Sequence, residues 1–148
     1  MGRVQDQVAV VTGAAQGLGR AIALRLAEEG ARMALCDIDG AGLDRTVADI
    51  TAKGGQAFGL VGDVTDEEPA AHLIADAVAR YGRLDVLVNN VGGSRPAMIW
   101  DMKVEDWDFV LRLNLRSAFL CTRAAVPHMV KQRSGRIVSV ASIVGLIG

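Results

Sequence analysis

Residues 12–19 read TGAAQGLG, and this segment decides the fold of the chain. It follows the apolar run VAVV at residues 8–11 and precedes a stretch rich in Ala and Leu with helical periodicity. Its three glycines let the backbone turn tightly, approach a ligand without an intervening Cβ and pack the helix close to the strand. A strand, a glycine-rich turn and a helix in this order are typical of a site that binds a pyrophosphate at the helix N-terminus.

Apolar runs that predict buried strands recur along the chain, and segments with helical periodicity lie between them. The expected strands are residues 8–11, 33–36, 57–61, 84–88 and 137–141, and the expected helices are residues 18–29, 41–53, 66–81 and 104–131. Gly30, Gly54 and Gly82 follow three of these helices, where a helix should end. Alternating helices and strands that are apolar on both faces predict an α/β fold with a parallel sheet. Because crossovers are right-handed, we expect a doubly wound sheet, the Rossmann fold.

An acidic residue, Asp37, follows the second expected strand. It lies 18 residues beyond Gly19, close to the spacing of about 20 at which a carboxylate binds the ribose hydroxyls of a dinucleotide. The carboxylate would repel a 2′-phosphate, and no Arg follows it directly, so the sequence favours NAD(H) over NADP(H) as cofactor. Two alternatives remain open: the glycine turn is a loop without a ligand, or Asp37 is a helix cap or solvated acid, a role that Asp39 could fill equally well.

Composition argues against several other classes of protein. Sixteen Lys and Arg against 17 Asp and Glu give a net charge of -1, without the dense basic face that nucleic-acid or anionic-membrane binding needs. Residues 1–11 contain no signal peptide or membrane-spanning stretch, so we expect a cytoplasmic protein. Cys36 and Cys121 lie among apolar neighbours and predict small buried thiols. His72 and His128 fit no metal-ligand spacing, so no metal is expected.

Further motifs make the chain resemble the short-chain dehydrogenase/reductase family along its whole length, in particular its 3-oxoacyl-acyl-carrier-protein reductase-like members. The turn matches the TGxxxGxG variant of the dinucleotide fingerprint, which implies cofactor binding by Gly13, Gln16, Gly17, Leu18 and Gly19. The resemblance also implies a seven-stranded sheet. Residues 1–148 would form its dinucleotide-binding domain, C-terminally incomplete, with the first five strands in the order 3-2-1-4-5.

Two more segments resemble cofactor-binding parts of the family. Asp63 and Val64 follow the third expected strand and resemble the pair that holds the adenine ring. The Asp63 carboxylate would accept a hydrogen bond from the amino group while the Val64 backbone N–H donates one; the alternative is that Asp63 caps the next helix. Residues 89–92, NNVG, resemble the NNAG segment. This implies that Asn90 and Gly92 steady the central sheet and line the ribose on the nicotinamide side.

Two residues resemble members of the family's catalytic group. Asn114 falls on the apolar stripe of the fourth expected helix, where leaving its amide buried and unpaired would cost about 1–3 kcal/mol. The resemblance implies that Asn114 holds a water in a proton relay; the alternative is a structural amide bonded to a neighbouring turn. Ser142, after the fifth expected strand, resembles the catalytic serine and would hydrogen-bond the carbonyl or hydroxyl oxygen of the substrate.

The family's proton donor, a tyrosine with a lysine four residues later, would follow that serine beyond Gly148. Tyr81, the one tyrosine of the sequence, has no such lysine and cannot replace it. We therefore expect these residues to be part of a longer chain. The complete protein would be an oxidoreductase that transfers hydride between NAD(H) and a secondary alcohol or ketone. Residues 1–148 alone would bind the cofactor but catalyse the reaction very slowly. The alternative is a module that binds a dinucleotide or a partner chain and catalyses nothing. The resemblance further implies a homotetramer or dimer joined in part through the fourth helix.

Overall fold

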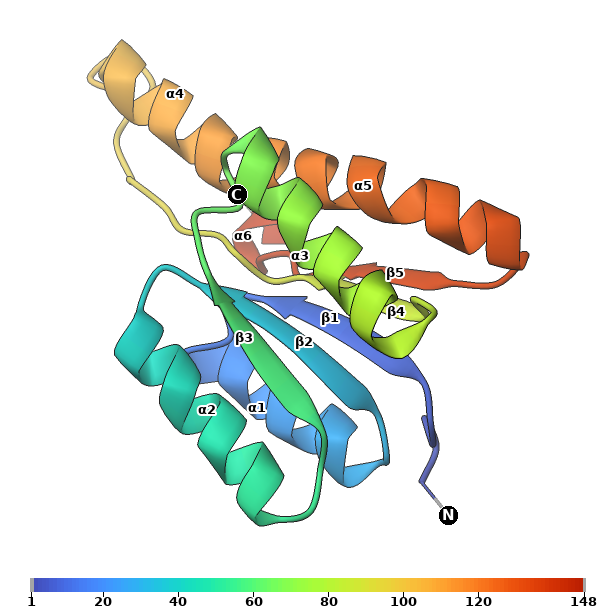
Figure 1. The fold of residues 1–148 in the computed structure, drawn as a ribbon. Helices are drawn as coiled ribbons and strands as arrows, with labels where there is room; N and C mark the ends of the chain where they lie inside the picture. The colour runs from blue at the N-terminus through green and yellow to red at the C-terminus, as the bar shows by residue number, and fades with distance from the viewer. Residues whose placement is uncertain (1, 148) are drawn as a thin grey trace.

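The computed structural model describes residues 2–147. These form one parallel sheet with helices on both faces (Figure 1). The elements are β1 (Val8–Thr12), α1 (Gly17–Glu28), β2 (Arg32–Asp37), α2 (Gly40–Ala52), β3 (Ala57–Val61), α3 (Glu67–Tyr81), β4 (Val86–Asn89), α4 (Val104–Leu111), a π-helical turn (Arg112–Arg116), α5 (Ser117–Gln132), β5 (Arg136–Ser139) and α6 (Val144–Ile147).

The five strands lie in the order β3-β2-β1-β4-β5, and every neighbouring pair is parallel. This confirms the predicted fold class and strand order. The chain winds from β1 toward β3, returns, and continues from β4 on the other side of β1. In sheets of this kind a ligand binds beyond the carboxyl ends of the strands where the winding reverses, so β1 and β4 mark the position of the site.

Strand β1 is apolar on both faces because each face is covered. Val8 and Val10 pack in a cluster with residues of α3 and α5, whereas Ala9 and Val11 pack in a second cluster with residues of α1 and α2. All four side chains are fully buried. Figure 1 shows the same division, with α1 and α2 on one side of the sheet and α3 and α5 on the other. A continuous apolar run, rather than an alternating one, is therefore what this strand requires.

The predicted helix ends are confirmed at three glycines. Gly30, Gly54 and Gly82 have φ of 93°, 82° and 77°, the left-handed region that closes a helix C-terminus at little cost when no Cβ is present. Only β3 has the predicted bounds; the other strands differ from their predictions by one or two residues at one or both ends. Strand β4 begins at Val86 rather than at residue 84, because the Gln132 side chain binds both the N–H and the C=O of Leu84, at 2.9 and 2.8 Å.

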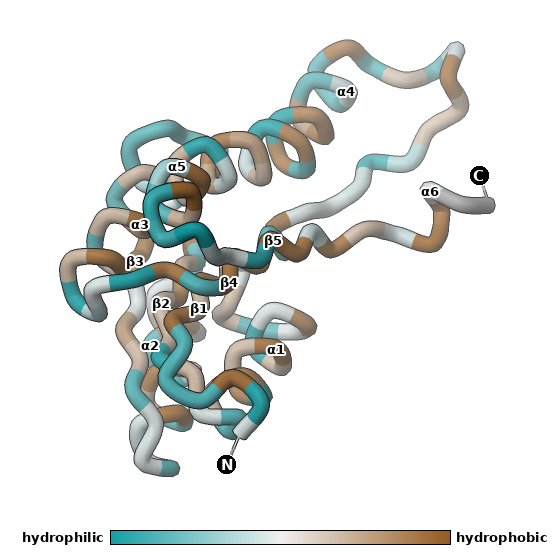
Figure 2. The backbone as a smooth tube through the Cα atoms, turned by 90° about the vertical axis from the view of Figure 1, so that its right-hand side faces the viewer, coloured by the Kyte–Doolittle hydropathy of each residue, from teal (hydrophilic) through white to brown (hydrophobic). Residues whose placement is uncertain are grey.

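Strand β5 lies at one edge of the sheet. It pairs with β4, and its Ile137 and Val138 side chains are 39% and 51% exposed. The expected apolar strand at 137–141 is thus an edge strand, and its regular pairing ends at Ser139. The stretch between β4 and α4 and the stretch after β5 leave the sheet on the same side (Figure 2). Within residues 2–147, no helix has the length and apolarity needed to span a membrane.

Candidate dinucleotide-binding site

A cleft of about 470 Å³ lies beyond the carboxyl ends of the central strands. Of the ten residues predicted to bind the cofactor, nine line this cleft: Gly13, Gln16, Leu18, Gly19, Asp37, Asp63, Val64, Asn90 and Gly92. The tenth, Gly17, is the first residue of α1, between two lining residues. Segments from four parts of the sequence therefore meet at one place.

Six further residues line the cleft: Cys36, Ile38, Gly62, Val91 of the NNVG segment, Phe109 and Leu113. The first four are chain neighbours of predicted residues. Phe109 and Leu113 come from the long helix that follows β4, and they lie four residues apart, on one side of that helix. Their spacing and their position near Asn114 were the only clues in the sequence. These clues do not show that this side of the helix faces a cleft.

The glycines of the turn are required by its geometry. Gly13 and Gly17 have φ of 67° and 54°, which residues with a Cβ rarely adopt. A Cβ on Gly19 would lie 2.0 Å from the carbonyl oxygen of Gly13, so no side chain fits there. The backbone N–H of Gly13 donates to the carbonyl oxygen of Cys36 at 2.8 Å, which fixes the turn on β2. The turn thus brings the N-terminus of α1, with its free N–H groups, to the cleft.

The Asp37 carboxylate organises the neighbouring wall. Its Oδ2 accepts from the backbone N–H of Ala15 at 2.9 Å, and its Oδ1 accepts from that of Asp39 at 3.0 Å. Asp39 fills the alternative role, since its own side chain accepts from the backbone N–H of Gly42 and caps α2. Asp37 is therefore not a helix cap. Each of its oxygens keeps a second lone pair for a ligand hydroxyl.

Asp63 and Val64 follow β3, the strand paired with β2, and line the same cleft. Asp63 Oδ1 accepts from the backbone N–H of Thr65 at 2.9 Å, an Asx turn, and α3 begins later, with Asp66 at its N-cap position. Asp63 is thus not the cap of α3. The Asp63 side chain is exposed, whereas Val64 is buried, with 3% of its surface accessible.

Asn90 joins the carboxyl ends of β1 and β4. Its Nδ2 donates to the carbonyl oxygens of Thr12 and Gly13, at 3.0 and 3.2 Å. In return, Thr12 Oγ1 accepts from the backbone N–H groups of Asn90 and Val91, at 3.0 and 3.2 Å. These four hydrogen bonds fix the glycine turn relative to β4, which is the sheet-steadying contact that the NNVG motif implied.

The helix predicted at 104–131 is interrupted around Asn114. Between α4 and α5 the backbone N–H of Ser117 donates to the carbonyl oxygen of Arg112, five residues back, instead of to that of Leu113. The Ser117 hydroxyl donates to the Leu113 carbonyl oxygen in its place. Asn114 Oδ1 accepts from the N–H of Gly93 at 3.1 Å, and Nδ2 donates to the C=O groups of Gly93 and Val110 at 2.8 and 2.9 Å. The amide is thus bonded to a neighbouring turn, as the structural alternative held.

The prediction that Asn114 lies on a buried apolar stripe is wrong. Asn114 is exposed, and α4 has no buried residue; Trp107 and Leu111 are 50% and 40% exposed. The reason is visible in Figure 2, where α4 extends past the sheet and meets no covering layer. Only the α5 half of the predicted helix carries a buried stripe, which includes Leu120, Cys121 and Ala125.

Ser142 follows the carboxyl end of β5, and the glycine turn follows the carboxyl end of β1, so both lie at the same end of the parallel strands. It is exposed, and its Oγ accepts from the backbone N–H of Val144 at 3.4 Å. Ser142 is not among the residues that line the cleft. The Tyr81 hydroxyl donates to the carbonyl oxygen of Met33 at 3.5 Å, away from the cleft, and burial raises the pKa of this phenol.

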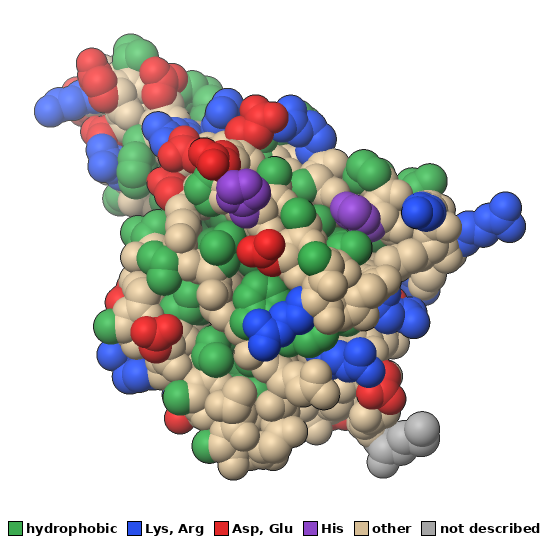
Figure 3. Space-filling model, in the orientation of Figure 1, with side chains coloured by type: hydrophobic (Ala, Val, Ile, Leu, Met, Phe, Trp, Pro, Cys, Tyr) green, Lys and Arg blue, Asp and Glu red, His purple; other side chains and the backbone are tan. Residues whose placement is uncertain are grey.

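The two thiols are buried, as predicted, and unpaired. Burial raises the pKa of Cys36 and of Cys121 to about 12, so neither is a thiolate near neutral pH. Across residues 2–147, no three His, Cys, Asp or Glu side chains come together as a metal site would require. Acidic and basic side chains are interspersed over the face shown in Figure 3, and no single-sign field covers it.

Comparisons with known proteins agree with this geometry. Residues 7–148 match the family model of the short chain dehydrogenases. A 3-oxoacyl-acyl-carrier-protein reductase of Thermotoga maritima is 42% identical over 146 residues, which cover 99% of this chain and 59% of the relative. The BbsD subunit of a hydroxy(phenyl)methylsuccinyl-CoA dehydrogenase of Thauera aromatica is 38% identical over 139 residues, 94% of this chain and 56% of the relative.

A solved structure from Burkholderia xenovorans, described as a short-chain dehydrogenase/reductase, superposes with a TM-score of 0.93 at 44% identity and covers 99% of this chain and 57% of its own. The chain thus spans less than three fifths of the length of these relatives. Fold, motif positions and sequence identity agree over nearly all 148 residues, and the chain belongs to the short-chain dehydrogenase family.

Proposed function

We propose that the cleft binds NAD(H) in preference to NADP(H), and that the protein transfers hydride between this cofactor and a secondary alcohol or ketone. One observation carries the proposal: the glycine turn and the Asp37 carboxylate meet in a cleft whose 15 lining residues include two carboxylates and no Lys or Arg. A 2′-phosphate placed there would meet negative charge without a cation to offset it.

The residues fit the cofactor in parts. The glycine turn and the N-terminus of α1 would hold the pyrophosphate. A Cβ on Gly17 would meet nothing within 4 Å, so the space beside this backbone is open to a ligand. The Asp37 carboxylate would accept from the adenosine ribose hydroxyls. Asp63 and Val64 would bind the amino edge of the adenine, and Asn90 and Gly92 would border the ribose on the nicotinamide side.

Catalysis is proposed for Ser142 and Asn114. When bound, a nicotinamide cofactor would supply or receive the hydride. The Ser142 hydroxyl would orient the substrate oxygen, on which negative charge develops, and Asn114 would position a water through the π-helical turn. Tyr81 does not serve as the proton donor, because its hydroxyl is bonded to Met33 outside the cleft. Turnover is therefore proposed for a protein that also carries the family's tyrosine and lysine.

The names of the relatives indicate which substrates to try first. One is named for a 3-oxoacyl group on a carrier protein and another for a hydroxyl-bearing CoA thioester. Both contain an acyl thioester with an oxidisable or reducible carbon in the acyl chain. We therefore propose 3-oxoacyl thioesters as the first substrate class, with the cytoplasm, where buried thiols stay reduced, as the compartment.

We also propose that the protein is a homodimer or homotetramer. Leu111, Leu115 and Phe119 follow one another at four-residue steps along α4, the π-helical turn and α5, and their side chains are 40%, 66% and 56% exposed. An apolar row of this kind favours pairing with a second copy. Sedimentation of Leu115→Glu should show a smaller species than the wild-type protein.

Binding and turnover are tested separately. Titrating the 148-residue chain into NADH should raise and blue-shift the nicotinamide fluorescence with saturation, and an unchanged spectrum would overturn the cofactor proposal. Turnover is measured with a 3-oxoacyl thioester and NADH in the protein that carries the catalytic tyrosine, where Ser142→Ala should reduce kcat by about 10²-fold or more. Binding of NADH without turnover would favour the non-catalytic binding module instead, and turnover that is unaffected by Ser142→Ala would overturn the role of Ser142.

A further inference from the structure

Two arginines of the π-helical turn hold the loop between β3 and α3. Arg112 Nε donates to Thr65 Oγ1 at 3.0 Å, and its Nη2 donates to Asp66 Oδ1 at 2.8 Å. Arg116 Nε donates to the carbonyl oxygen of Thr65 at 2.9 Å. Side chain and backbone of Thr65 are thus both fixed by guanidinium groups from a helix some 50 residues further along the chain.

Thr65 is also the residue that orients Asp63. The Thr65 side chain is buried, and its backbone N–H donates to Asp63 Oδ1 at 2.9 Å. Val64 lies between the two. The Asp63 carboxylate and the Val64 backbone N–H therefore depend on where Thr65 is held, and Thr65 is held by Arg112 and Arg116.

The loop has space into which it could move without these contacts. A side cavity of about 270 Å³ is lined by Asp63, Thr65, Phe109, Arg112 and Leu113. Asp63, Phe109 and Leu113 also line the larger cleft, so the two spaces are adjacent. Removing the guanidinium of Arg112 would free the loop on the side that borders this cavity.

We propose that Arg112, supported by Arg116, is a positioning residue that sets the selectivity for the base of the dinucleotide. Arg112 holds Thr65, and through Thr65 it holds Asp63 and Val64. In this position the Asp63 carboxylate would accept from the 6-amino group of adenine, and the Val64 backbone N–H would donate to the ring nitrogen. This inference rests on the proposed cofactor site. It adds a specificity role for a residue that lies outside the larger cleft.

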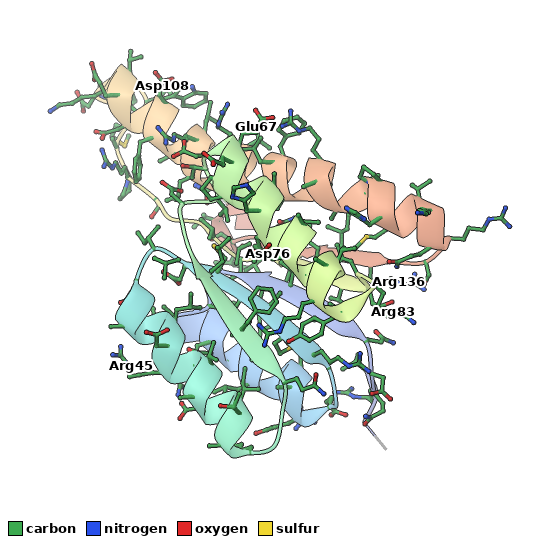
Figure 4. All side chains as sticks on the ribbon, in the orientation of Figure 1. Arg45, Glu67, Asp76, Arg83, Asp108 and Arg136 are labelled. Carbon is green, nitrogen blue, oxygen red and sulfur yellow. The ribbon has the colours of Figure 1, made fainter. Side chains whose placement is uncertain are left out.

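The structure offers a matched control on the same pair of helices. Arg123 on α5 forms an ion pair with Glu67. Glu67 is the first residue of α3 and is labelled in Figure 4. Arg112, from the π-helical turn, and Arg123, from α5, thus both link this part of the chain to the start of α3. Among the described residues, Arg123 forms no hydrogen bond with Thr65 or Asp66. A variant at Arg123 therefore removes a link of the same kind but leaves the contacts of the loop between β3 and α3 intact.

The test compares the reduced dinucleotide that carries adenine with its hypoxanthine analogue, which presents a carbonyl and a ring N–H at the same edge. Both are titrated by nicotinamide fluorescence against the 148-residue chain and three variants: Arg112→Met, Thr65→Val and Arg123→Met. Thr65→Val removes the hydroxyl acceptor but keeps the backbone N–H that binds Asp63. Because the readout is a ratio of two dissociation constants for one sample, partial unfolding cancels.

We expect the wild-type chain to prefer adenine by about tenfold or more, since a site built for a donor rejects an acceptor. Arg112→Met and Thr65→Val should lower this preference by at least about threefold, and Arg123→Met should leave it unchanged. A preference that is equal in the wild type and in both loop variants overturns the inference while NADH binding stands. Equal binding of the two bases by the wild type also overturns it. No binding of NADH overturns the proposed function itself.

Discussion

The backbone N–H of Ala15 donates to Asp37 Oδ2 at 2.9 Å, so the residue proposed to bind the ribose also anchors the glycine turn. The second oxygen of Asp37 accepts from the backbone N–H of Asp39. The phosphate-binding and ribose-binding parts of the cleft are therefore one hydrogen-bonded unit, and a change at Asp37 acts on both.

Replacement of Asp37 should destabilise the fold as well as weaken binding. Ala15 is buried, with 4% of its surface accessible, and Asp37→Ala leaves its N–H without an acceptor. We expect the free energy of unfolding to fall by about 1–3 kcal/mol in urea denaturation. Asp37→Asn keeps a carbonyl acceptor and should lose less. Equal stability of the wild type and Asp37→Ala would contradict the anchoring role.

Two glycines of the turn should differ in what a methyl group does. At Gly17 a Cβ meets nothing within 4 Å, so Gly17→Ala costs only the left-handed backbone, about 1–2 kcal/mol. At Gly19 the Cβ would collide with the Gly13 carbonyl oxygen, so Gly19→Ala must open the turn and should unfold at a lower urea concentration than Gly17→Ala. The reverse order would contradict the described turn.

The Asn114 amide should protect a specific backbone group. It accepts from the N–H of Gly93, and Asn114→Ala removes this acceptor and the bond to the Gly93 carbonyl oxygen. Hydrogen exchange at the Gly93 amide should become faster by about tenfold, as expected for a lost bond of roughly 1.4 kcal/mol. Asn114→Asp keeps the accepting oxygen and serves as the control. Equal exchange in all three proteins would exclude the contact.

The sequence predicted the fold well because its determinants are local. The fold class follows from the alternation of apolar runs and helices, and the strand order was implied by the family resemblance. The glycine turn contains its own geometry at Gly13, Gly17 and Gly19. Nine of the ten predicted cofactor residues line one cleft because they lie at the carboxyl ends of strands, in the segments that follow these ends, or in the first turn of α1. Parallel strands bring such positions to one edge.

The features that were missed depend on long-range packing. Periodicity placed Asn114 on a buried stripe, but whether a helix face is covered depends on how far the helix extends past the sheet, as α4 does. The π-helical turn was missed for a different reason: the Ser117 hydroxyl bonds to the Leu113 carbonyl oxygen in place of a backbone N–H, and a serine in a helical pattern does not by itself indicate this. The contacts of Arg112 with Thr65 and Asp66 join segments that only the fold brings together.

A buried acid, Asp85, predicts how stability depends on pH. Burial alone would raise its pKa, but hydrogen bonds from Arg83, at 2.8 and 2.7 Å, and from the N–H of Val8 outweigh burial and hold the pKa below its usual value. Figure 4 shows Arg83 near the end of α3. Because the folded pKa is the lower one, Asp85 contributes stability above the unfolded value of about 3.9, and this contribution is lost as pH falls through the folded pKa.

The comparison with Asp85→Asn isolates this effect. The difference between the unfolding free energies of wild type and variant should be constant from about pH 7 to pH 5. It should shrink below about pH 4, where the unfolded state binds a proton that the folded carboxylate does not yet take up. Urea denaturation at pH 7, 5, 4 and 3 measures it. A difference that stays constant down to pH 3 would show that these hydrogen bonds do not favour the ionised form.

If the Asp37 carboxylate makes this cleft a site for NAD(H), the chain should discriminate between the two cofactors. A fluorescence titration of the 148-residue chain with NADH and with NADPH tests this most directly. We expect the wild type to bind NADH at least about tenfold more tightly, because the 2′-phosphate meets Asp37 and no cation. Asp37→Ala should bring the two dissociation constants within about threefold of each other. Tighter binding of NADPH by the wild type, or the same preference for NADH in Asp37→Ala, would contradict the account.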